Sequence, residues 1–129
     1  MALFVYQTEE CKEDSREHSI GKDINIFIDR ILRTQRTTFF DNFPPPYLKK
    51  RFKRQERLLC AERKIGDDVV VVFYRILVRG SFEYSNFLKY PKKYGDEKFA
   101  PLVTDDELKN WVSQQKKRKC CAGEANFKK

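Results

Sequence analysis

The sequence predicts an α+β domain in which an antiparallel sheet of about four strands carries helices on one face. Two apolar runs predict strands: ALFVYQ at residues 2–7 and VVVVFYRILVR at residues 69–79. Residues 23–35 predict a helix, because their apolar side chains recur at intervals of three and four residues. We assign residues 1–115 to this single domain, including a short C-terminal helix, and residues 116–129 to a mobile, disordered basic tail.

The segment after the first strand is polar and then becomes helical. Residues 8–18 are mixed in charge, so we expect a loop or a frayed helical turn there. In residues 23–35, Asp23 can accept backbone N–H bonds as the N-cap of a helix. The prolines at residues 44–46 exclude a continuing helix. The predicted apolar face of this helix comprises Ile24, Phe27, Ile28 and Ile31.

A strongly basic segment follows the prolines. Six of the nine residues from position 49 to position 57 are Lys or Arg. Leu48 and Phe52 share a face in a helix and also in a strand, but good helix formers after a proline run favour a helix. The helix would expose a basic face opposite its apolar one. The cations predicted to contact nucleic acid are Lys49, Lys50, Lys53, Arg54 and Arg57.

The middle of the chain predicts a β-hairpin. Residues 58–65 and 69–79 are the strands, and the GDD sequence at residues 66–68 supplies the turn. The second strand is apolar on both faces at its start, which is typical of a central strand. Toward its end, Arg75 and Arg79 project from the same side.

The remaining elements are shorter. After the break at Gly80, residues 82–88 predict another strand returning to the sheet. Thr104 and Glu107 match a capping box, which predicts the start of the short C-terminal helix.

Composition and motifs exclude several classes of protein. No apolar run approaches the roughly 20 residues of a membrane span, and the N-terminus does not resemble a secretory signal, so we expect a cytoplasmic protein. Four cysteines without a C-x-x-C pair and a single histidine make a zinc site improbable. Phosphate-loop and dinucleotide motifs are absent from the sequence, and we expect neither a cofactor nor a metal.

The distribution of charge is the strongest functional signal. The net charge is +8, and residues 47–64 contain eight Lys and Arg against two Glu, while residues 110–129 contain six against one. Clustered positive charge suits an anionic partner, such as RNA or DNA. The alternatives are a solvated helix face with a tail that aids solubility, an anionic membrane surface, or an acidic protein partner.

Residues 58–84, LLCAERKIGDDVVVVFYRILVRGSFEY, resemble the C-terminal half of the RelE/ParE toxin family. The shared order is a strand, an acidic turn, a Val-rich strand, a basic residue (Arg79) and a closing aromatic residue (Tyr84). The resemblance implies RNA binding and, in the RelE branch, ribosome-dependent cleavage of messenger RNA. It makes Arg79 and Tyr84 candidate catalytic residues, and strand geometry adds Arg75. ParE-like members lack nuclease chemistry, so the resemblance leaves open whether this protein is an enzyme.

Three functional hypotheses follow. The first is a nucleic-acid-binding α+β domain, as an accessory module of a larger nucleic-acid-processing protein. The second is a RelE-like endoribonuclease toxin that cleaves messenger RNA. The third is a protein-interaction domain whose positive charge is incidental.

Overall fold

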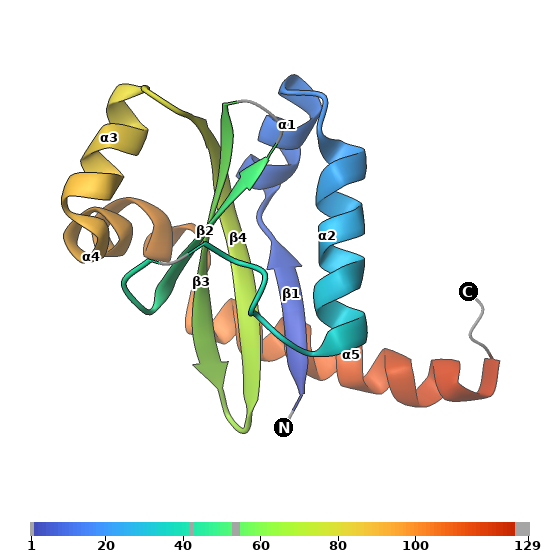
Figure 1. Ribbon diagram of the computed structural model, residues 1–129. Helices are drawn as coiled ribbons and strands as arrows, with labels where there is room; N and C mark the ends of the chain where they lie inside the picture. The colour runs from blue at the N-terminus through green and yellow to red at the C-terminus, as the bar shows by residue number, and fades with distance from the viewer. Residues whose placement is uncertain (1, 42, 53–54, 126–129) are drawn as a thin grey trace.

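The computed structural model describes residues 2–41, 43–52 and 55–125, and these contain four strands and five α-helices (Figure 1). In this part of the chain, no helix is both long and apolar enough to cross a membrane. The elements follow in the order β1 (Leu3–Gln7), α1 (Glu9–Glu17), α2 (Gly21–Thr34), β2 (Tyr47–Phe52), β3 (Glu56–Ile65), β4 (Asp68–Val78), α3 (Phe82–Lys89), α4 (Pro91–Tyr94), the π-helical turn η1 (Gly95–Phe99), the 3₁₀ turn η2 (Ala100–Leu102) and α5 (Asp105–Ala125).

The strands form one mixed sheet in the order β1-β4-β3-β2. The pairs β2–β3 and β3–β4 are antiparallel, but β1 runs parallel to β4, with Leu3 beside Val69 and Gln7 beside Phe73. The α+β class is therefore confirmed, whereas the prediction of a purely antiparallel sheet is wrong. A parallel pair needs a long connection, and here two helices and a hairpin separate β1 from β4.

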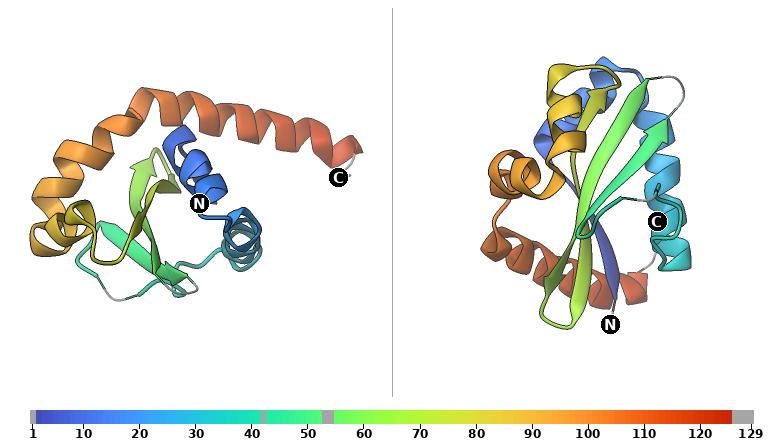
Figure 2. Two further views of the ribbon diagram at one scale, coloured as in Figure 1. Left: turned by 90° about the horizontal axis from the view of Figure 1, so that it is seen from above. Right: turned by 60° about the vertical axis from the view of Figure 1, so that its left-hand side comes forward.

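Helices cover both faces of the sheet, which corrects the prediction that they pack on one face. Figure 2 shows α1 and α2 on one side of the sheet and α3 and α4 on the other. We call these sides the α2 face and the α3 face. The core of the α2 face includes Ile24, Phe27, Leu58, Val71 and Phe73. The core of the α3 face includes Leu59, Val70, Val72, Phe87 and Leu108.

A β-bulge in β4 changes which side chains reach each face. The pairing of β4 with β3 skips Tyr74, so the alternation of side chains shifts at that point. Regular alternation would put Ile76 in the core of the α3 face, but Ile76 lies in the core of the α2 face and Leu77 takes its place. The same shift carries Arg79, two residues after Leu77, to the α3 face.

The described part of the basic segment lies mainly in strands β2 and β3 instead of the predicted helix. Strand β2 pairs with β3 over its whole length, from Tyr47 opposite Ala61 to Phe52 opposite Glu56. The spacing of the apolar residues fits both structures. Pairing with β3 decides between them, because it buries Tyr47 in the core of one face and Phe52 in the core of the other. Successive side chains of β2 therefore point to opposite faces, and the basic residues do not form a single ridge.

Residues 82–88 form helix α3 instead of the predicted strand. Gly80 adopts a φ of 88°, a left-handed conformation that favours glycine and ends β4. The Ser81 hydroxyl then caps the helix by accepting a hydrogen bond from the Tyr84 N–H at 3.2 Å. Tyr84 and Phe87, three residues apart, are buried together, whereas Phe82 is exposed, as expected for a helix with one apolar face.

Residues 9–17 form helix α1, where we expected only a loop or a frayed turn. The Thr8 hydroxyl accepts from the Cys11 N–H at 3.0 Å and donates to the Tyr74 carbonyl at 2.8 Å. Because β1 pairs with only the first half of β4, the second half leaves an open edge on that side. Helix α1 covers this edge, and the Asp14 carboxylate accepts from the Ile76 N–H at 3.0 Å.

The other helices largely follow the sequence pattern. Helix α2 begins at Gly21, so Asp23 lies in its first turn and not at the N-cap. The predicted capping box of α5 is confirmed, since Thr104 Oγ1 accepts from the Glu107 N–H at 3.1 Å while Glu107 accepts from the Thr104 N–H at 2.9 Å. The α5 backbone continues to Ala125, beyond the short helix we expected. Mobility of residues 116–129 stays a prediction.

Candidate nucleic-acid interface

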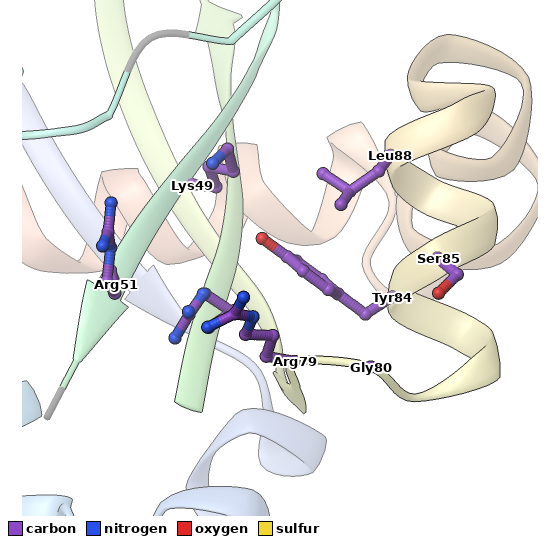
Figure 3. Close-up of a pocket in the computed structure, with 8 residues that line it drawn as sticks. Lys49, Arg51, Arg79, Gly80, Tyr84, Ser85 and Leu88 are labelled. Atoms are coloured by element: carbon purple, nitrogen blue, oxygen red, sulfur yellow. The ribbon is translucent and has the colours of Figure 1, made fainter. Parts of the chain in front are cut away.

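A basic pocket opens between the sheet and helix α3. Its volume is about 460 Å³, which is typical of a ligand site. Strands β2 and β3 and the end of β4 supply its cations, and α3 supplies the opposite wall (Figure 3). We define this basic pocket by its lining residues, which are Lys49, Arg51, Arg57, Arg79, Gly80, Tyr84, Ser85 and Leu88.

Strand geometry brings the four cations to one face. Lys49 and Arg51 are two residues apart on β2 and therefore point to the same side. On β3, Arg57 lies directly opposite Arg51. The Arg79 N–H donates to the Gln55 carbonyl at 2.8 Å, which extends the β3–β4 pairing and brings Arg79 beside this cluster.

Helix α3 positions a phenol against these cations. Tyr84 is only 5% exposed, and in Figure 3 its ring reaches from α3 toward the strands, between Lys49 and Arg79. Phe87 anchors the helix by stacking on Phe43, with ring centroids 5.0 Å apart. The Tyr84 ring is thus fixed in the wall, where its hydroxyl can donate a hydrogen bond but its face is too buried for a base to stack on it.

The electrostatics of the pocket favour an anion. Three guanidinium groups and one ammonium line it, and the described lining residues include no carboxylate. Arg57 is only 6% exposed, and its Nη1 donates to the neighbouring Glu56 carbonyl at 3.1 Å. The Lys49 ammonium lies 5.8 Å from the centre of the Phe43 ring. Guanidinium groups bind phosphate oxygens through two parallel N–H donors, so the pocket is suited to phosphate.

No family model matches the sequence, and no curated protein is significantly similar to it.

The pocket unites four of the residues that the sequence singled out. Lys49 and Arg57, predicted to contact nucleic acid, lie beside Arg79 and Tyr84, predicted as candidate catalytic residues. Lys50 lies on the α2 face, where its ammonium donates to the Phe39 carbonyl at 3.2 Å and lies 5.4 Å from the centre of the Phe27 ring. The predictions for Lys53 and Arg54 fall outside the described residues.

Arg75 belongs to a different environment. Its Nε donates to Asp14 Oδ2 at 2.6 Å and its Nη2 donates to Asp14 Oδ1 at 3.2 Å, forming a two-bond ion pair with α1. Asp14 is buried, and its carboxylate holds the pKa of Arg75 above the ordinary value. Arg75 lines a second cavity on the other side of α3 and does not line the basic pocket.

Several residues of the pocket were not predicted from the sequence. Arg51 belongs to the basic segment but is not among the residues predicted to contact nucleic acid. The helix assumed there placed Arg51 near its apolar side. Ser85 and Leu88 carry no chemical motif, and they line the pocket only because residues 82–89 form a helix. The signal available in the sequence was Ser81, a favoured N-cap residue, directly after Gly80 at the end of the strand.

Two aspartates, Asp68 and Asp105, have structural roles. Asp68 accepts from the Ala2 N–H at 3.0 Å and pairs with the Lys116 ammonium at 2.5 Å. Asp105 pairs with Arg63 at 2.6 Å. Within the residues that the structure describes, no three His, Cys, Asp or Glu side chains gather as a metal site would require.

Proposed function

We propose that this protein binds nucleic acid, with a backbone phosphate held in the basic pocket. The observation that carries this proposal is the convergence of Lys49, Arg51, Arg57 and Arg79 on one concave site. A polyanion compensates such a cluster, because each phosphate brings a negative charge and oxygens that accept several hydrogen bonds. The binding module would suit an accessory role in a larger nucleic-acid-processing protein.

Solubility alone does not account for this arrangement. Positive side chains that only keep a protein soluble do not need to lie opposite one another on paired strands. Like charges in such positions destabilise the fold. Burial of Arg57 within the cluster adds a desolvation cost. The third hypothesis, a protein-interaction domain whose positive charge is incidental, gives no reason for four cations to converge on one pocket.

Binding can be measured by fluorescence anisotropy with a labelled single-stranded oligonucleotide over a range of salt concentrations. If phosphates are bound, the logarithm of the association constant should fall by roughly 0.7–0.9 per phosphate contact for each tenfold rise in salt. Arg79→Gln should weaken binding and reduce this slope by about one contact. Arg36→Gln removes the same charge from an exposed site after α2 and is the matched control. Equal effects of the two variants would contradict the proposal.

A RelE-like endoribonuclease is the second candidate. The observation that favours it is the presence of Arg79 and Tyr84, the two residues carried over from the resemblance, in one pocket with Lys49 and Arg57. In such a reaction, the cations would stabilise charge on the phosphorus centre as the RNA chain breaks. The Tyr84 hydroxyl would contact the reacting nucleotide, since its ring is too buried to stack against a base.

A further inference from the structure

Helix α3 and its C-cap residue Tyr90 carry a cluster of exposed apolar side chains. Five large hydrophobic side chains are exposed in the described part of the chain, and three of them, Phe82, Leu88 and Tyr90, lie within nine residues. Phe82 is 81% exposed, the highest value among them. Burying a phenylalanine side chain stabilises a protein by roughly 1.5–3 kcal/mol. Because Phe82 stays exposed, the fold gains almost none of this free energy. A ligand that covers the Phe82 ring would gain it on binding.

A second cavity of about 440 Å³ lies beside Phe82, between α3, η1 and β4. Phe99, which is 4% exposed, and Tyr94 give it an aromatic floor. Burial raises the pKa of Tyr94, with a further contribution from the Glu83 carboxylate, so the phenol stays protonated and can donate a hydrogen bond. The Asn86 carboxamide adds one donor group and one acceptor. We call this the Phe82 cavity; its lining residues are Arg75, Phe82, Glu83, Asn86, Tyr94, Lys98 and Phe99.

The Phe82 cavity and the basic pocket lie on either side of the same short helix. Tyr84 and Ser85 line the basic pocket, while Glu83 and Asn86 line the Phe82 cavity. An α-helix with its side chains is about 10–12 Å across, so the two sites are separated by little more than that. Gly80, which joins β4 to α3, lines the basic pocket, and Phe82, two residues later, lines the Phe82 cavity, so a nucleic-acid strand that passes over this connection would meet both.

We propose that the Phe82 cavity receives an unpaired nucleobase, stacked on Phe82, from a single strand whose phosphate lies in the basic pocket. This inference rests on the proposed function and narrows its substrate to single-stranded nucleic acid. Asn86 and Glu83 offer hydrogen bonds to the edge of the base, and Phe82 covers its face. A duplex cannot enter in this way, because its bases are paired and stacked inside the helix.

The test compares three labelled ligands by fluorescence anisotropy at low salt: oligo-dT, the same oligo-dT annealed to oligo-dA, and a chain of abasic spacers of equal length. The wild type should bind oligo-dT most tightly. Phe82→Ala should lower the affinity of the protein for oligo-dT by about 5- to 150-fold, the range expected for one base–aromatic stack. Affinity for the abasic chain should not change, and Phe82→Trp should retain the affinity for oligo-dT.

Ile26→Ala is the matched control. Ile26 is 58% exposed, and it lies on α2, on the opposite side of the sheet from both sites. It should leave all three affinities unchanged. If the abasic chain binds as tightly as oligo-dT and Phe82→Ala has no effect, the base site is overturned while phosphate binding stands; such a result would favour a protein partner for Phe82. If none of the three ligands binds at low salt, the proposed function itself is overturned.

Discussion

Arg51 and Arg57 lie directly opposite each other on the antiparallel strands β2 and β3, and both line the basic pocket. Opposite residues on neighbouring strands have Cβ atoms about 4.5–5.5 Å apart, and like charges there are destabilising. The pair also lies beside Arg79 in the same cavity. The folded protein therefore holds these positive charges close together, where one bound anion can contact more than one of them.

Arg51→Gln should raise the free energy of unfolding by about 0.2–1 kcal/mol at low salt, because it removes the cross-strand repulsion with Arg57. The gain should shrink as salt screens the charges. Urea denaturation at two salt concentrations measures both effects. Lys49→Gln is the control, since Lys49 faces the apolar Leu59. An equal gain in the two variants would show that repulsion across the strand pair is not the cause.

Asp14→Ala should destabilise the fold by about 2–3 kcal/mol. The variant removes an ion pair with Arg75 and leaves the Ile76 N–H without its acceptor at the open edge of β4. Denaturation in urea, followed by circular dichroism, measures the change. Glu13→Ala, at the exposed neighbouring position of α1, should change stability by less than about 0.5 kcal/mol. A comparable loss in both variants would contradict the role of Asp14.

Gly95→Ala should destabilise the protein by about 1–3 kcal/mol through overpacking. A Cβ at position 95 would lie 2.6 Å from Cε1 and 2.7 Å from the hydroxyl of Tyr47, a buried residue whose hydroxyl donates to Asp96 at 2.6 Å. Thermal unfolding measures the loss. Gly21→Ala is the control, because its nearest neighbour, Ser15 Oγ, is 3.9 Å away. A stable Gly95→Ala variant would mean that the Tyr47 ring can move aside.

The sequence carries enough information to predict the elements that depend on local chemistry. The β3–β4 hairpin, the helix containing Ile24 and the capping box at Thr104 follow from turn residues, periodicity and capping, and the structure confirms them. The parallel placement of β1 and the bulge at Tyr74 depend on contacts between distant segments, which periodicity does not report.

In the candidate site, too, some features follow from the local sequence and others depend on contacts between distant segments. The clustered charge singled out Lys49 and Arg57, and the resemblance singled out Arg79 and Tyr84. The fold brings all four into one pocket. The helix assigned to the basic segment was wrong because the spacing of its apolar residues fits helix and strand equally, and only pairing with β3 distinguishes them. That error concealed the role of Arg51, whose position opposite Arg57 depends entirely on strand register.

Acid should weaken the attachment of α5 to the sheet. The Lys116 ammonium, together with the Ala2 N–H, holds the pKa of Asp68 below its ordinary value of 3.8. Because the folded pKa is lower than the unfolded one, the stabilisation is fully present above about pH 4 and is lost as the pH falls through the lowered pKa. Asp68→Asn should therefore lower the free energy of unfolding by about 1–2 kcal/mol at pH 7. The difference from the wild type should become progressively smaller toward pH 2.

Urea denaturation of the wild type and Asp68→Asn across this pH range measures the difference. Asp67→Asn, at the exposed neighbouring turn position, is the control and should follow the wild type. A difference between the wild type and Asp68→Asn that stays constant down to pH 2 would exclude ionisation of Asp68 as its source.

Cleavage of messenger RNA separates a binding module from a RelE-like enzyme. If the basic pocket is catalytic, the purified protein should cut RNA on ribosomes, and Arg79→Ala should lower the rate by about 10²- to 10³-fold, as expected when one group that stabilises transition-state charge is removed. Tyr84→Phe keeps the buried ring and removes only the hydroxyl, so it should retain the fold and lose rate if that hydroxyl contacts the reacting nucleotide. Arg36→Ala is the control. Intact RNA with the wild type, under conditions where oligonucleotides bind, would exclude the enzyme and leave the binding module.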